Sequence, residues 1–184
     1  MAKTALVILA EGFEEVEAIG PVDVLRRAGV RVTLAGLVDR RVESSRKIKV
    51  EADILLRDLV GIPDAVILPG GLPGATNLAQ SGDVSCLVKK MNGEGKIIAA
   101  ICAAPAVVLA PLGILEGKKA TCYPGCEDDF SKKTLYVQEP VVVDGNVITS
   151  QGPGTALEFA LAIAACLVGQ GMADIVRGKM LIKA

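Results

Sequence analysis

The stretch Lys96-Ile-Ile-Ala-Ala-Ile-Cys-Ala-Ala-Pro-Ala-Val-Val-Leu-Ala110 predicts a strand that turns sharply into a helix at Cys102. The continuous apolar run 97–101 is typical of a strand that is covered on both faces. The helix is expected from Ala103 onward, with Pro105 in its first turn, where a missing N–H leaves no helical bond unmade. Small side chains crowd around the sulfur, as a tight nucleophile elbow requires. The stretch therefore predicts an α/β fold with a cysteine at the carboxyl end of one strand.

Apolar strand patterns and helical patterns alternate along the rest of the chain. Strands are expected at residues 5–10, 30–37, 65–68 and 97–101, and helices at residues 14–28, 84–91, 155–168 and 172–181. In the first of these helices, the core stripe is expected to include Val16, Ile19 and Leu25. Strands separated by helices predict a doubly wound, mostly parallel sheet with helices on both faces, in a single domain that spans residues 1–184.

The section 134–150 departs from this alternation. Residues 135–137 and 141–149 have the composition of strands, and Asp144-Gly145 supplies a hairpin turn. We expect a small antiparallel insertion near one edge of the sheet.

The composition excludes several classes of partner. The 184 residues carry 20 basic and 21 acidic side chains, so there is no basic footprint for nucleic acid or for an anionic membrane. The apolar run 4–10 is short and is followed by acidic residues, which favours a strand over a signal peptide. The most apolar helix, 156–168, contains Glu158 and is shorter than the ~20 residues that a membrane span needs. The sequence predicts a soluble protein.

The chain contains five cysteines and no histidine. Without imidazole, a Cys-His dyad, a Ser-His-Asp triad and a histidine-ligated metal are all excluded. An odd, irregularly spaced set of cysteines is atypical of a secreted disulfide framework and favours a reducing, cytoplasmic location. Cys122 and Cys126 form the one close pair, and the sequence supplies no obvious further ligands for zinc, so no metal is expected.

Cys102 has two interpretations. In the functional one, unpaired N–H groups and the positive end of the helix dipole favour the thiolate and lower the pKa of the thiol. In the other, Cys102 is a small buried hydrophobic residue. Cys86 and Cys166 are interpreted as buried hydrophobic residues, whereas Cys122 and Cys126 could be exposed.

Other segments should meet Cys102, because ligand sites in parallel sheets lie beyond the carboxyl ends of the strands. Glu14 and Glu17 share a helix face, and they either cap the helix at the surface or place one carboxylic acid, with a raised pKa, near the sulfur. Gly70-Gly71 either only ends a strand or exposes an N–H group to an oxyanion. The glycine-rich segment 150–155 is either a packing or interface element or part of an anion site at a helix N-terminus.

Together these segments resemble the DJ-1/PfpI family, and within it the DJ-1 branch. The matching pieces, in the family's order, are Ala5-Leu-Val-Ile-Leu-Ala10 with Glu14-Glu15-x-Glu17, Asp23-Val-Leu-Arg-Arg-Ala-Gly29, Ile67-Leu-Pro-Gly-Gly71, Ala99-Ala-Ile-Cys-Ala-Ala-Pro105, and Thr149-Ser-Gln-Gly-Pro-Gly-Thr155 with Glu158-Phe-Ala-Leu161. The pieces span nearly the whole chain, and the ordered set is far more specific than any one motif.

The resemblance implies a flavodoxin-like fold, a homodimer and no cofactor. It implies that Cys102 is the reactive cysteine, that Glu17 is the protonated acid beside it, and that Gly71 and Ala103 offer backbone N–H groups to an oxyanion. The substrate or anion pocket that it implies consists of Gly70, Tyr123, Arg46 and Pro153.

The sequence also departs from the family's pattern. Protease-like relatives place histidine after the nucleophile, where this chain has Ala103, so proteolysis is not expected. Many close relatives have histidine where Tyr123 stands, which puts histidine-assisted turnover in doubt. Ser44 replaces a cysteine that is a secondary redox site in some relatives. Gln151 replaces an arginine that is common in animal members of the family. The affinity for anions near the dimer interface should therefore differ from theirs.

The expected function is cysteine-dependent, cofactor-free conversion of small α-oxoaldehydes, such as methylglyoxal and glyoxal, to hydroxy acids. Deglycation of glycated proteins would use the same chemistry, and a redox-sensitive Cys102 would contribute to protection against oxidative stress. The alternative is a non-catalytic redox sensor or chaperone. A flavin- or nucleotide-binding module is a distant third, because no Lys-Ser/Thr follows the run Gly70-Gly-Leu-Pro-Gly74.

Overall fold

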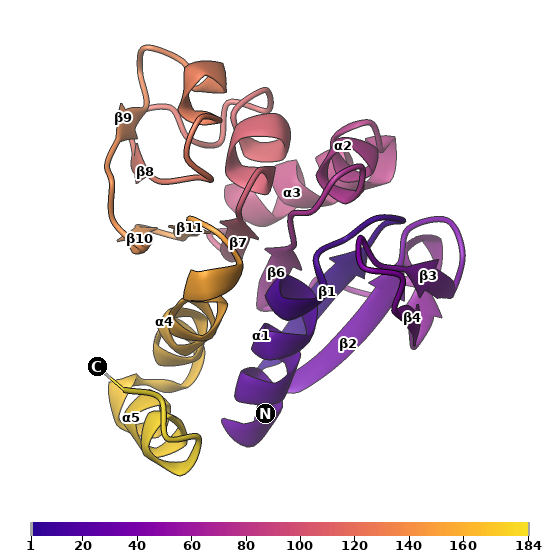
Figure 1. Cartoon of the computed structure of the whole chain (residues 1–184), viewed down its shortest axis with the longest axis vertical. Helices are drawn as coiled ribbons and strands as arrows, with labels where there is room; N and C mark the ends of the chain where they lie inside the picture. Colours follow the sequence, from indigo (N-terminus) through magenta and orange to yellow (C-terminus); the bar gives the residue numbers. More distant parts are fainter. Residues whose placement is uncertain (1, 184) are drawn as a thin grey trace.

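The fold is organised around one large, twisted sheet (Figure 1). The computed structural model describes residues 2–183. The sheet has seven strands in the order β10-β11-β7-β6-β1-β2-β5. In chain order they are β1 (Thr4–Leu9), β2 (Arg31–Gly36), β5 (Ile54–Leu55), β6 (Ala65–Leu68), β7 (Ile97–Ile101), β10 (Val141–Asp144) and β11 (Val147–Ser150). All neighbouring strands are parallel except β10, which runs antiparallel to β11.

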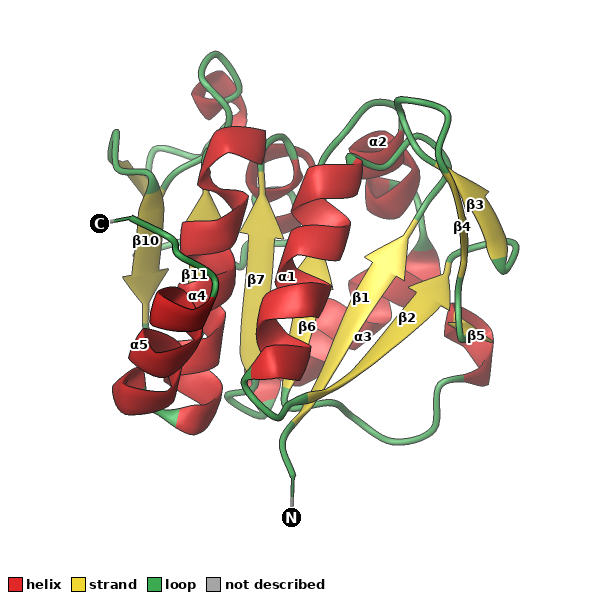
Figure 2. Ribbon diagram, turned by 60° about the horizontal axis from the view of Figure 1, so that its bottom comes forward, coloured by secondary structure: helices red, strands yellow, loops and turns green. Residues whose placement is uncertain are grey.

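Helices cover both faces of this sheet (Figure 2). One face carries α1 (Glu15–Arg27), α4 (Ala156–Val168) and α5 (Gln170–Lys179), and the other carries α2 (Gly74–Ala79), α3 (Gly82–Gly93) and the π-helix Pro105–Leu109. The strand side chains alternate between two apolar cores: Val7 packs with the first group of helices, whereas Leu6 and Ile8 pack with the second. The predicted doubly wound, mostly parallel sheet with helices on both faces is therefore confirmed.

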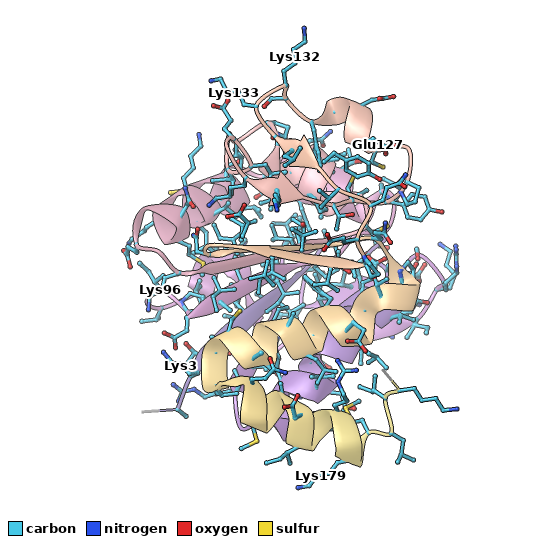
Figure 3. The ribbon with its side chains drawn as sticks, turned by 90° about the vertical axis from the view of Figure 1, so that its left-hand side faces the viewer. Lys3, Lys96, Glu127, Lys132, Lys133 and Lys179 are labelled. Carbon is cyan, nitrogen blue, oxygen red and sulfur yellow. The ribbon has the colours of Figure 1, made fainter. Side chains whose placement is uncertain are left out.

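Two small sheets flank the central one. Strands β3 (Arg41–Glu43) and β4 (Lys49–Glu51) form an antiparallel hairpin. Strands β8 (Lys119–Ala120) and β9 (Leu135–Tyr136) pair in parallel in a segment that protrudes from the body, where Figure 3 shows Glu127, Lys132 and Lys133.

The structure confirms the antiparallel hairpin expected near a sheet edge in section 134–150 and corrects the placement of one strand. The antiparallel hairpin is formed by β10 and β11, with a turn at Gly145 (φ +61°), and β10 is an edge strand of the central sheet. Leu135 and Tyr136 instead belong to the parallel β8–β9 pair. The hairpin turn expected at Asp144-Gly145 is therefore confirmed, and it joins the two strands within residues 141–149.

The predicted core stripe of α1 is partly wrong. Leu25 is buried, but Val16 is 47% exposed and Ile19 is 39% exposed. The helix instead turns Glu17, Ala18 and Val22 inward. The side of α1 that faces the sheet is set by where the chain leaves β1. The mixed apolar and acidic sequence of the helix does not encode which side that is.

The cysteines also correct the sequence interpretation. Cys86 on α3 and Cys166 on α4 are exposed, whereas Cys122 is buried and Cys126 is half-buried. All of them are free thiols. Among the helices in residues 2–183, none combines the length and the apolar character that crossing a membrane requires.

Candidate functional site

Cys102 lies in a sharp turn at the carboxyl end of β7. Its φ is +64°, a left-handed conformation that non-glycine residues seldom adopt. Two backbone hydrogen bonds hold it there, from the Cys102 N–H to the Ser150 carbonyl (3.0 Å) and from the Tyr123 N–H to the Cys102 carbonyl (2.8 Å). The surrounding backbone therefore imposes the elbow that lifts the sulfur out of the strand.

The helical segment after the elbow is a short π-helix rather than a regular α-helix. It spans Pro105–Leu109, with the Ala110 N–H donating to the Pro105 carbonyl at 3.0 Å. Proline lies at its start, as the sequence predicts, because that position needs no N–H donor. Segments of this kind occur often at functional sites.

Glu17, in the first turn of α1, points inward toward the elbow. Its side chain is fully buried, and its Oε2 atom accepts a hydrogen bond from the Gly70 N–H at 2.8 Å. Its Oε1 atom is also buried and has no hydrogen-bond partner among residues 2–183. Glu14, which could have taken this position, instead accepts a hydrogen bond from the Ser45 hydroxyl (3.0 Å).

Burial controls the protonation of this carboxyl group. Desolvation raises the pKa of Glu17 from 4.5 to about 7, against the opposing effects of the Gly70 N–H and the Cys102 thiol. A substantial fraction of Glu17 is therefore a neutral carboxylic acid at neutral pH, able to donate a proton as well as accept one.

The thiol does not behave as the helix N-terminus argument predicts. Burial, followed by repulsion from the Glu17 carboxylate, raises the pKa of Cys102 to about 12. The Gly71 and Ala103 N–H groups hydrogen-bond the sulfur and lower that pKa, but they do not outweigh desolvation. The expected low-pKa thiol is therefore wrong. Protonation of Glu17 removes the repulsion but leaves the larger effect, which is burial.

Gly70 and Gly71 bring the chain after β6 against the pair. A methyl group at Gly70 would lie 2.5 Å from Cβ of Cys102, 2.7 Å from Oε2 of Glu17 and 3.1 Å from the sulfur. Gly71 has φ +84°, and a methyl group there would lie 2.5 Å from the Gly12 carbonyl oxygen. Only glycine allows the backbone to approach so closely.

Two of the other expected pocket residues lie nearby. The backbone of Tyr123 is bonded to Cys102, and its ring packs on Gly152, where an added Cβ would lie 3.3 Å from the ring and 4.0 Å from Oε1 of Glu17. Pro153 follows Gly152, is exposed, and begins a short 3-10 helix, Pro153–Thr155. Tyr123 is half-exposed, so its ring forms an edge of the site.

Arg46 is placed differently. It lies exposed on the turn between β3 and β4, and no hydrogen bond or ion pair within residues 2–183 joins it to Cys102 or Glu17. Its neighbour Ser45 makes the link to the site, through the bond to Glu14 and through its N–H, which donates to the Phe13 carbonyl (2.8 Å).

Sequence reasoning missed some of the residues that hold the elbow. The Ser150 carbonyl fixes the Cys102 backbone, and Gly152 leaves space for the Tyr123 ring. The glycine-rich segment 150–155 indicated that the backbone there takes part in the site. It did not indicate which backbone atoms make the contacts. Over the same described residues, no group of three or more potential ligands is arranged to hold a metal.

Comparisons with known proteins identify the family of this chain. Residues 3–166 match the model of the DJ-1/PfpI family. The chain is 46% identical to the zebrafish (Danio rerio) Parkinson disease protein 7 homolog, over 98% of both chains. It is 39% identical to glutathione-independent glyoxalase DJR-1.2 of Caenorhabditis elegans, covering 91% of this chain and 90% of that protein.

A crystal structure of Drosophila melanogaster DJ-1beta superimposes with a TM-score of 0.93 and 45% identity, covering all of both chains. This similarity confirms the flavodoxin-like fold that the resemblance implied. The chain belongs to the DJ-1/PfpI family.

Proposed function

We propose that this protein converts small α-oxoaldehydes to α-hydroxy acids, with Cys102 as nucleophile and Glu17 as proton carrier. The observation that carries the proposal is the fully buried Glu17 carboxyl group, which lies beside the Cys102 thiol and has an unpartnered Oε1. A buried acid with a pKa of about 7 suits general acid–base work at neutral pH. The similarity to a protein named as a glyoxalase supports the same reaction class.

The first step forms a carbon–sulfur bond. Because the pKa of Cys102 is raised to about 12, the resting thiol holds its proton. As the sulfur adds to the aldehyde carbon of methylglyoxal, the Glu17 carboxylate takes that proton and then returns it to the developing alkoxide. The product is a hemithioacetal, and Glu17 is again ionised. The Gly71 and Ala103 N–H groups are the donors best placed to stabilise the alkoxide.

The second step moves a proton between adjacent carbons. Glu17 removes the hydrogen from the carbon bonded to sulfur, which gives an enediol, and delivers a proton to the neighbouring carbon. This produces the thioester of lactate. Water then cleaves the carbon–sulfur bond, releasing lactate and the thiol. Methylglyoxal and water are consumed and lactate is formed, with no net oxidation and no cofactor. Deglycation would be the same chemistry on a protein-bound adduct.

The same geometry supports a second role, in redox sensing. Peroxide can oxidise the sulfur to a sulfinic acid in two steps, each of which consumes one peroxide and releases water. The protonated Glu17 carboxyl group would then donate a hydrogen bond to a sulfinate oxygen. A sensor without catalysis would accumulate this form under mild peroxide and would not consume methylglyoxal.

A homodimer is part of the proposal. Val16 and Ile19 on α1 and Leu157 on α4 leave apolar side chains exposed on neighbouring helices, which pack together at Gly20 and Leu157. Exposed apolar side chains that adjoin in this way are typical of subunit interfaces.

The proposed activity is tested by lactate formation from methylglyoxal in the absence of glutathione, followed by NMR. The reduced parent should form lactate, and Cys102→Ser should not. Cys86→Ser, which changes an exposed cysteine on α3, is the matched control and should retain parental turnover. Equal lactate formation by the parent and Cys102→Ser would refute the proposal.

A further inference from the structure

A cavity of about 620 Å³, apart from the Cys102 elbow, lies at the carboxyl ends of β1 and β2. Leu37 and the exposed Val38 give it an apolar lining, and neither Cys102 nor Glu17 contributes to it. Its volume lies within the ~300–1,000 Å³ that is usual for small-molecule sites. The crevice beyond the carboxyl ends of parallel strands is also where ligands bind in open α/β sheets.

The walls of this cavity are fixed by close contacts. After β2 the chain folds back so tightly that a methyl group at Gly36 would overlap the Asp39 carbonyl oxygen, at 1.9 Å. On the other side, the side-chain amide of Asn77 donates to the Glu11 carbonyl at 2.9 Å. The Gly12 N–H donates to the Glu43 carbonyl at 2.8 Å, which fastens the β3–β4 hairpin. The cavity is therefore preformed.

Charges of both signs line the cavity without pairing. Within residues 2–183, the Arg41 guanidinium makes no ion pair or hydrogen bond, although Glu11, Asp39 and Asp83 share the lining. The adjacent Arg40 differs, because it donates to the Ala52 carbonyl (2.9 Å) and pairs with Glu51 (3.7 Å).

The carboxylates retain acceptor capacity. Glu11 uses one oxygen, Oε2, to accept from the Glu43 N–H (3.0 Å), and Asp39 uses Oδ1 to accept from the Arg41 N–H (3.1 Å). The second oxygen of each has no bond within the described chain, and the Asp83 carboxylate has none at all. A ligand with an ammonium group would meet free acceptors here, and a ligand with a carboxylate would meet a free guanidinium.

We propose that this cavity binds a zwitterion with an apolar body, of the chemical class of an aliphatic dipeptide. The ligand's carboxylate pairs with Arg41, its ammonium group with Asp39 and Asp83, and its side chains pack on Leu37 and Val38. The excess of carboxylates over guanidinium disfavours phosphate-bearing ligands. The volume suits a dipeptide better than a single small amino acid.

The test is isothermal titration of the reduced full-length protein with leucyl-leucine. Its N-acetylated form and its C-terminal amide serve as probes that lack one charge each. The parent should bind the dipeptide saturably, and Arg41→Gln should weaken that binding by about tenfold or more, the loss of one charge-assisted contact. Arg41→Gln should leave the affinity for the amide unchanged, because the amide offers no carboxylate. Asp39→Asn should weaken binding of the amide but not of the N-acetylated form.

Two controls keep the outcome decisive. Arg31→Gln removes an exposed arginine at the opposite end of β2 and should bind as the parent does. Cys102→Ser should also bind normally, since the cavity is separate from the elbow. Thermal unfolding establishes that each variant is folded. The proposal is overturned if the folded parent does not bind leucyl-leucine saturably. It is also overturned if Arg41→Gln loses the same affinity for the dipeptide as for its amide.

Discussion

The Oε2 atom of Glu17 accepts a hydrogen bond from the Gly70 N–H at 2.8 Å, which anchors the buried carboxyl group of α1 to the loop after β6. The bond uses one oxygen atom and leaves Oε1 without a partner. Burial then raises the pKa of Glu17 to about 7. The geometry thus keeps a proton-exchanging group beside Cys102 in a chain that has no histidine.

Glu17→Gln should lower the pKa of Cys102 below about 12, because it removes the repulsion from the Glu17 carboxylate. The amide is close in size to the carboxyl group, so the backbone around the elbow should persist. The rate of thiol alkylation as a function of pH measures this pKa. Glu14→Gln, which changes the nearby carboxylate that bonds Ser45, should leave the pKa of Cys102 unchanged. A Cys102 pKa that does not fall in Glu17→Gln would mean that repulsion does not contribute.

Gly70→Ala should disrupt the site by steric overlap. The added methyl group would lie 2.5 Å from Cβ of Cys102, and relieving that overlap should cost ~1–3 kcal/mol of unfolding free energy, as overpacking usually does. Urea unfolding measures the change. Gly82→Ala, at the start of α3, adds a methyl group that meets no neighbour within 4 Å and should not destabilise the protein. Equal stability of both variants would contradict the packing described at Gly70.

The raised pKa of Glu17 makes stability depend on pH. Between about 4.5 and about 7, the folded protein retains a proton on Glu17 that the unfolded chain releases. The unfolding free energy should therefore fall as pH rises through this window, by ~3 kcal/mol for this group alone, since each pKa unit is worth about 1.4 kcal/mol. Denaturant titrations at several pH values, compared with Glu17→Gln, isolate the effect. If the unfolding free energy falls equally with pH in both proteins, Glu17 is not the group responsible for the pH dependence.

Ile19→Asp should dissociate the proposed homodimer. Ile19 is 39% exposed on α1, and a charge there would have to be buried at the interface. Sedimentation velocity should show a dimer for the parent and a monomer for the variant. Val60→Asp, at a side chain that is 94% exposed on another part of the surface, should remain dimeric. A monomeric parent at micromolar concentration would contradict the dimer.

The strands that build the sheet could be predicted because their apolar runs are continuous. Residues 65–68 and 97–101 form strands with the predicted bounds. Short polar elements such as β3 and β4 were missed, because each has three residues and their pairing depends on tertiary contacts. The exposed Val16 shows the same limit, since the composition of a helix does not identify which of its apolar side chains face away from the sheet.

The candidate site could be predicted only in part. The small residues around Cys102 signalled the elbow, and the acidic run 14–17 signalled a nearby carboxylate. The raised pKa of the thiol could not be predicted, because it depends on how deeply the sulfur is buried and on its distance from Glu17. The exposed position of Arg46 likewise depends on how the β3–β4 hairpin docks on the loop before α1.

The most direct test of the Cys102–Glu17 pair is the turnover of methylglyoxal by Glu17→Gln, compared with Glu14→Gln, in fully reduced, folded protein without glutathione. The account predicts that Glu17→Gln forms lactate at least ~100-fold more slowly than the parent, as expected when a general acid–base group is lost. Glu14→Gln should keep the parental rate. Parental turnover by Glu17→Gln would contradict the assignment of Glu17 as the proton carrier.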